Sequence, residues 1–250
     1  MIPPGLALRG SQASGSAQGG CPSWARRRGS GLRSAAVDPG YPAVVAGCPL
    51  PGGLFLFSRR CLVSSRSLVV FAGSRGLGSS SLSLVSPVVR AVLRAGFGVS
   101  VGCSRGADAL VLSAFFAVGG LPSALSVFAV GGSSGRGFWR GSAVGLVRRA
   151  AAAGSRVFWC SGGPLSFSLP RRLRSRSFAC VRSAGAVAAA GGRGAFVAFV
   201  SGGFSASRGS WAAARVALRA GLPVVVFPVG CSVSRVPALG GRWVVAGLGV

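Results

Sequence analysis

From residue 67 onward, hydrophobic and polar positions alternate between two patterns. Nearly continuous apolar runs predict buried strands at 68–72, 98–101, 124–130, 156–159, 196–200 and 223–227. Longer Ala-, Leu- and Arg-rich stretches predict helices at 82–95, 105–118, 142–153, 178–190 and 210–220, followed by Gly96, Gly119, Gly154, Gly191 and Gly221. Because apolar strands alternate with helices, we expect an α/β fold with helices on both faces of a mostly parallel sheet. Residues 242–250 are expected to add an edge strand.

The first 66 residues lack such a pattern. They are rich in Gly, Ser, Pro and Arg without a sustained period, which predicts a mostly disordered tail at 1–66 ahead of one domain at 67–250. An uncharged, mostly apolar stretch at 109–135 is long enough for a membrane span. Gly119, Gly120 and Pro122 interrupt it, so a helix and a short buried strand are favoured and no membrane association is expected.

Composition narrows the chemistry that the chain can perform. It has 28 Arg and two Asp but no Lys, Glu, His, Thr or Asn, which gives a net charge of +26. A Ser–His–Asp triad, a histidine metal site and a paired-carboxylate glycosidase are thereby excluded. Seven cysteines without a CxxC spacing predict scattered buried thiols in a reducing cytoplasm, and we expect neither a metal nor a cofactor.

The abundant residue types are those whose codons need no adenine: Phe, Leu, Ser, Cys, Trp, Pro, Arg, Val, Ala and Gly. We infer that the coding strand is poor in adenine, so part of the positive charge reflects the base composition of the gene. A reading frame that selection has not shaped is the alternative, and Asp108 argues against it because it stands inside an ordered motif. Residues 67–250 carry 20 Arg and one Asp, a net charge of +19, which favours binding to polyanions.

Gly- and Arg-rich loops follow several of the expected strands. They lie at 73–76, 102–108, 131–137 and 201–210. In a parallel sheet, ligands bind beyond the carboxyl ends of the strands, where glycine lets backbone N–H groups approach a phosphate and arginine adds a charged fork. The loops therefore predict a phosphate or sugar-phosphate cradle, although each loop alone is also compatible with an ordinary turn.

Asp108 has two interpretations. It can be a carboxylate in the first turn of a helix, stabilised there by about 0.3–1 kcal/mol through the helix dipole. It can instead accept a ligand hydrogen bond or clamp Arg75 or Arg105. We favour the second interpretation, because mutation against adenine would have erased a merely helpful charge.

Several of these motifs together resemble a known superfamily. Gly73-Ser74-Arg75, the segment GCSRGADAL at 102–110, and Gly209-Ser210-Trp211 with 221–228 resemble the Rossmann-like superfamily of DNA-processing protein A and the "lonely guy" nucleotide hydrolases. The segment 173–177 resembles the Arg-x-Arg element of DNA-processing protein A. The resemblance implies a Rossmann-like three-layer fold and a pocket lined by Gly73, Ser74, Arg75, Gly102, Arg105, Gly106, Asp108, Arg174, Arg176, Gly209 and Ser210.

Two functions follow, and they belong to different classes. The first is binding of a nucleotide or of single-stranded DNA, with Phe138, Trp139 or Trp211 available for base stacking. The second is a phosphoribohydrolase acting on nucleoside monophosphates. The hydrolases carry a catalytic Glu where this chain has Ala213, so binding without a catalytic residue is favoured. Self-association of the chain is left open.

Overall fold

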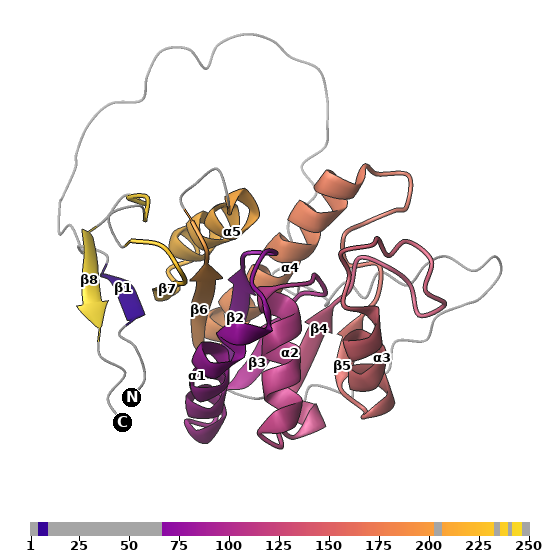
Figure 1. Cartoon of the computed structure of the whole chain (residues 1–250), viewed down its shortest axis with the longest axis horizontal. Helices are drawn as coiled ribbons and strands as arrows, with labels where there is room; N and C mark the ends of the chain where they lie inside the picture. Colours follow the sequence, from indigo (N-terminus) through magenta and orange to yellow (C-terminus); the bar gives the residue numbers. More distant parts are fainter. Residues whose placement is uncertain (1–4, 10–66, 203–206, 233–235, 240–241, 247–250) are drawn as a thin grey trace, which may run out of the picture.

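In a computed structural model of the protein, the structure describes residues 5–9, 67–202, 207–232, 236–239 and 242–246. Within these residues the strands form one sheet in the order β5-β4-β3-β2-β6-β7-β1-β8 (Figure 1). The strands from β2 to β7 pair in parallel, whereas β1 pairs antiparallel with β7 and β8. Their bounds are β1 Gly5–Arg9, β2 Ser67–Gly73, β3 Gly98–Val101, β4 Leu125–Phe128, β5 Arg156–Phe158, β6 Arg193–Val200, β7 Val224–Pro228 and β8 Arg242–Ala246.

Helices cover both faces of this sheet. Successive side chains of a strand point to opposite faces, and in β2 Val69 and Phe71 face one core cluster while Leu68 and Val70 face the other. Helices α1, α2 and α3 pack on the first cluster, and α4 and α5 pack on the second (Figure 1). The α-helices are α1 Leu82–Arg94, α2 Ala107–Ala117, α3 Val144–Ala152, α4 Leu169–Ala189 and α5 Arg208–Arg219, and the 3-10 helices are η1 Ser79–Ser81 and η2 Pro122–Ala124.

The chain changes direction across the sheet at β2. Strand β2 lies between β3 and β6, so the crossover after β2 runs to one side and the crossover after β6 runs to the other. The chain therefore leaves the carboxyl ends of β2 and β6 toward opposite sides of the sheet, and such a switch point is where doubly wound sheets bind ligands. This Rossmann-like arrangement confirms the expected α/β fold with a mostly parallel sheet.

The predicted helix ends agree closely with the structure. Each α-helix is followed, two residues after its last residue, by a glycine with positive φ, a backbone conformation that L side chains rarely adopt. The stretch at 109–135 folds as the end of α2, η2 and β4, as expected. None of the helices in the described ranges combines the length and apolar character that a membrane span requires.

Two elements differ from the expectations. We expected a helix at 178–190, but α4 begins nine residues earlier, at Leu169, and the Arg-x-Arg segment therefore lies on the helix rather than before it. Residues Gly5–Arg9, within the expected disordered tail, form β1, because β7 and β8 offer hydrogen-bonding edges on both of its sides. Strand β8 confirms the predicted strand at the sheet edge, while 247–250 lie outside the described residues.

Candidate functional site

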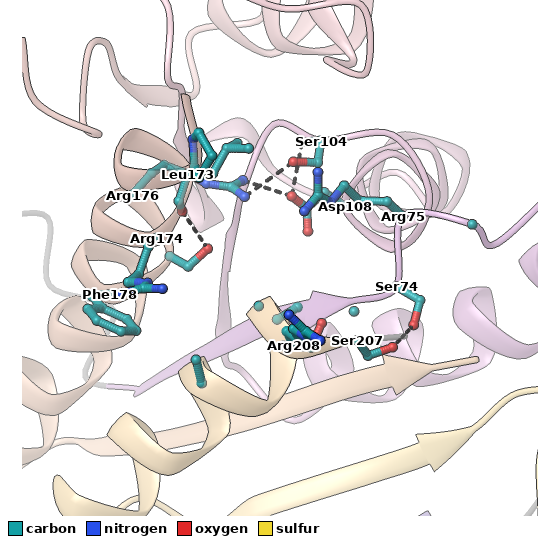
Figure 2. A pocket seen from close by; sticks show the side chains of 18 of the residues that line it. Ser74, Arg75, Ser104, Asp108, Leu173, Arg174, Arg176, Phe178, Ser207 and Arg208 are labelled. Carbon is teal, nitrogen blue, oxygen red and sulfur yellow. Dashed lines mark hydrogen bonds and ion pairs between the residues drawn. The ribbon is translucent and has the colours of Figure 1, made fainter. Parts of the chain in front are cut away.

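A cavity of about 590 Å³ lies at the switch point of the sheet. Its walls are the loop after β2, the first half of α4 and the start of α5 (Figure 2). Polar groups line it from the loops that follow β2 and β6. An apolar wall on α4 is formed by Leu169, Pro170, Leu173 and Phe178. The volume falls in the range of about 300–1,000 Å³ that is usual for small-molecule sites.

A buried ion pair forms one wall of the cavity. Asp108, in the first turn of α2, accepts a hydrogen bond at 2.8 Å from Nη1 of Arg176 on α4 and another at 3.0 Å from the backbone N–H of Ser104 (Figure 2). Nη2 of Arg176 reaches the Ser104 hydroxyl at 3.3 Å. The side chains of Asp108 and Arg176 are each 8% exposed. Asp108 thus clamps Arg176. The sequence suggested a ligand hydrogen bond or a clamp on Arg75 or Arg105, and the predicted partners of the clamp were wrong.

Arg176 keeps its charge in this setting. Burial by itself lowers the pKa of the Arg176 guanidinium, but the attraction of the nearby Asp108 carboxylate, which also accepts its hydrogen bond, leaves that pKa above its ordinary value. A buried charge is stable only when it is paired and hydrogen-bonded. The pair therefore ties α2 to α4 and brings no net charge to the cavity wall.

Gly102 makes room for this ion pair. A Cβ atom at this position would overlap the guanidinium of Arg176 and the carboxylate of Asp108. The position directly after β3 therefore requires glycine, because these two side chains approach the backbone closely there. Its role is to let α4 lie close to the strand end.

Serine side chains join the two loops at the switch point. The hydroxyl of Ser74, after β2, shares a hydrogen bond with the hydroxyl of Ser207, before α5, and accepts another at 2.8 Å from the backbone N–H of Ser201, after β6 (Figure 2). Ser74 and Ser207 are buried. These contacts hold together two loops whose joined residues are 127 and 133 positions apart in sequence.

Positive charge faces the cavity from three elements. Arg75 follows β2, Arg174 lies on α4 and Arg208 opens α5, and all three are exposed and line the cavity. The start of α5 adds backbone N–H groups that lack partners within the helix, and no acidic residue lies in its first turn. The cavity is therefore suited to an anion.

The structure brings together eight of the eleven residues that the sequence suggested. Gly73, Ser74, Arg75, Asp108, Arg174, Arg176, Gly209 and Ser210 line the cavity. Gly102 lies behind the ion pair, and Gly106, with φ +77°, packs against the backbone of Ser74 and Arg75. Arg105 is exposed outside the lining, and its backbone N–H donates to Gly141 O at 2.6 Å.

Other lining residues were not named individually from the sequence, although Ser104, Ser207 and Arg208 lie in the loops at 102–108 and 201–210 that predicted the cradle. Ser104 stands inside the motif at 102–110, and its adjacency to Asp108 along a loop could have suggested it. Ser207 and Arg208 precede Gly209 and occupy the start of a helix, where the chain presents backbone donors. The apolar wall on α4 was not predicted, because the helix was expected to begin only at residue 178.

The loop at 131–137 and the aromatic residues are placed differently from the expectation. That loop follows β4 but does not line the cavity. Trp211 is fully buried in the core, and Phe138 packs against the other core cluster. Trp139 is partly buried, and its ring lies under the guanidinium of Arg75, 5.3 Å from its centroid.

Ala213, which the sequence resemblance pairs with a catalytic Glu, does not line this cavity. Ala213 is buried in the core cluster under α5 and lines a separate space of about 20 Å³ together with Asp108 and Arg176. Asp108 is the one carboxylate in the described residues of the domain, and Arg176 and Ser104 hold it.

Two buried thiols lie near the ion pair. Burial raises the pKa of Cys180 to about 12, and its sulfur is 3.1 Å from the hydroxyl of Ser100. Burial also raises the pKa of Cys103, whose sulfur accepts a hydrogen bond from the backbone N–H of Val130. Both thiols therefore stay protonated near neutral pH. Cys103, Cys160 and Cys180 are buried, as the sequence predicted, whereas Cys231 is partly exposed and the other three cysteines lie outside the described residues.

The doubly wound sheet and the cavity at its switch point define a Rossmann-like α/β protein with a pocket at the strand ends. No protein-family model matches the chain, and no curated protein matches it. Among solved structures, DNA processing protein A from Streptococcus pneumoniae is similar to it, with a TM-score of 0.47 and 17% identity. The match covers 65% of this chain and 50% of that protein, so the chain matches about half of its length.

Proposed function

We propose that this protein binds the phosphate groups of a nucleotide or of single-stranded DNA in the cavity at the switch point. The proposal rests on the net positive charge around this cavity. Asp108 is neutralised by Arg176, which leaves the exposed guanidinium groups of Arg75, Arg174 and Arg208 around one cavity. Guanidinium groups bind phosphate oxygens in bidentate fashion, with more directional hydrogen bonds than a single ammonium group provides.

The start of α5 supports the same ligand. Backbone N–H groups at a helix N-terminus, together with the helix dipole, favour phosphate. Arg208, Gly209 and Ser210 place these groups on the wall of the cavity. The apolar wall with Phe178 offers a surface for the uncharged part of the ligand.

A charge-matched comparison tests the site. The double variant R174A/R208A removes two cavity arginines from α4 and α5, whereas R182A/R219A removes two exposed arginines from the same helices away from the cavity. Binding is measured by fluorescence anisotropy with labelled oligothymidylate and with a labelled nucleoside monophosphate. We expect R174A/R208A to weaken binding at least about tenfold, because hydrogen bonds to charged groups contribute about 1.5–3 kcal/mol each. R182A/R219A should weaken it less than about threefold.

Two outcomes would count against the proposal. Equal losses in the two double variants would mean that the general positive charge attracts the ligand and the cavity does not. Absence of binding to either probe at low salt would reject phosphate binding altogether. Binding of only one probe would identify which of the two ligand classes the site takes.

A further inference from the structure

Arg75 has an aromatic partner from a distant part of the chain. Its guanidinium lies over the ring of Trp139, with the carbon Cζ 5.3 Å from the ring centroid, within the distance of about 6 Å at which such pairs attract. Arg149, Arg171 and Arg193 also lie over aromatic rings, but none of these three lines the cavity. Of these four stacked arginines in the described part of the chain, Arg75 is therefore the one that lines the cavity.

Trp139 is held firmly in place. Its backbone N–H donates to the Ser142 hydroxyl at 3.2 Å, and its carbonyl accepts from the Ser142 N–H at 2.9 Å. Its ring packs against the core cluster under α1, α2 and α3. Gly141 lies so close to this ring that a Cβ there would overlap it. The indole is thus a fixed surface, whereas Arg75 is exposed.

The loop that carries Trp139 is tied to the walls of the cavity. Gly141 O accepts from the backbone N–H of Arg105, and the N–H of Ala143 donates to Cys103 O at 2.8 Å. From the other side, Arg172 on α4 donates to Gly137 O. The position of the indole is therefore set by the segment before Asp108 and by α4, the same parts of the chain that form the buried ion pair.

The ring face of Trp139, and not its N–H, is the part that matters here. Its Nε1 is buried and has no hydrogen-bond partner among the described residues. A buried donor without a partner is unfavourable, so the residue is not explained by a hydrogen bond. An indole has the aromatic face that attracts a guanidinium most strongly.

We propose that Trp139 is a positioning residue that holds the Arg75 guanidinium at the edge of the cavity for a ligand phosphate. This inference rests on the proposed function. An exposed arginine loses rotamer freedom when it binds a phosphate, and stacking on a fixed ring removes much of that freedom before the ligand arrives. Trp139 acts through Arg75 and does not itself contact the ligand.

A double-mutant cycle tests this role. The variants W139L, R75A and W139L/R75A are titrated with labelled oligothymidylate, and their thermal unfolding is followed in parallel. W139L should weaken binding about two- to fivefold, the loss that corresponds to one exposed cation–π contact. In the R75A background the same change should have no further effect, because the guanidinium that Trp139 positions is gone. W139F, which keeps an aromatic face, should retain more than half of the affinity and should fold if W139L does not.

The outcomes separate this inference from the proposed function. The positioning role is overturned if W139L weakens binding by the same factor in the unmodified protein and in the R75A background. It is also overturned if W139L alone leaves binding unchanged. Equal affinity of W139F and W139F/R75A overturns it as well. If R174A/R208A and R182A/R219A weaken binding equally, or the unmodified protein does not bind, the proposed function itself fails and the role of Trp139 fails with it.

Discussion

Three effects stabilise the Asp108 carboxylate, which organises the site. It lies in the first turn of α2, near the positive end of the helix dipole, and accepts the backbone N–H of Ser104. It also neutralises Arg176, which would otherwise be a buried charge without a counterion. These contacts explain why an acid stands here in a chain that has two acids in all.

Replacing Asp108 by Asn should destabilise the protein strongly. The change keeps the shape of the side chain but leaves the Arg176 guanidinium buried without an opposite charge, which costs about 3–5 kcal/mol. Urea unfolding followed by circular dichroism measures the change in the free energy of unfolding. The double variant D108N/R176M, which removes both charges, should recover at least half of the loss. A D108N protein as stable as the unmodified one would show that the pair does not hold α2 to α4.

The sequence pointed to Asp108 but not to its partner. Asp108 was recognisable because it stands in an ordered motif after an apolar strand, and a lone acid among arginines invites an ion pair. Arg75 and Arg105 were the nearest cations in the motifs, whereas Arg176 lies 68 residues further along the chain. A contact between two elements depends on how the helix packs on the sheet, which local patterns do not specify.

At the scale of elements, α4 shows why some boundaries escape pattern analysis. Its buried face carries Arg172, Arg176, Cys180 and Ala184, spaced by four residues. The first two are arginines, which a hydrophobic pattern counts as exposed, so the helix was expected only from residue 178. Pro170 in the first turn was the available signal for an earlier start.

Strands β2, β3, β4, β6 and β7 were predictable because they are largely buried and therefore form nearly continuous apolar runs. Strand β5, at the sheet edge, is not buried, and its short apolar run was the available signal. Strand β1 was not predictable, since its five residues sit in a stretch rich in Gly and Pro and gain their order from pairing with β7 and β8. Such pairing joins residues more than 200 positions apart and leaves no local period.

The contact between α4 and the sheet should make stability depend on pH in alkaline solution. Cys180 packs against Ser100 of β3, and its pKa rises from an ordinary 9.0 to about 12 in the folded protein. A group whose folded pKa is raised contributes stability that is complete below its unfolded pKa and is lost as the pH rises toward the folded pKa. Between about pH 9 and about pH 10.5, this thiol should lower the free energy of unfolding by about 2 kcal/mol.

The variant C180A isolates this effect. It lacks the thiol, so its free energy of unfolding, measured in urea at the same pH values, should fall less steeply than that of the unmodified protein. The difference between the two slopes is the quantity of interest, because the smaller side chain also lowers stability at every pH. Identical slopes would mean that the Cys180 thiol ionises in the folded protein as easily as in the unfolded one.

For the whole molecule, the main question is whether a specific cavity or the overall charge attracts the ligand. A net charge of +26 draws polyanions to many parts of the surface. The cavity adds three arginines and a helix N-terminus at one place, and a buried ion pair fixes its wall. If the overall charge attracts the ligand, removing any two arginines should weaken binding by a similar amount. If the cavity binds the ligand, removing cavity arginines should abolish individual phosphate contacts.

The salt dependence of binding separates these two cases most directly. The logarithm of the association constant for labelled oligothymidylate is plotted against the logarithm of salt concentration, and the slope reports about 0.7 for each phosphate that the protein neutralises on a single strand. We expect R174A/R208A to reduce the magnitude of the slope by about 1.4, since two contacts are lost. R182A/R219A, with the same net charge, should leave the slope nearly unchanged. Equal changes of slope in the two variants would contradict a phosphate site at the switch point.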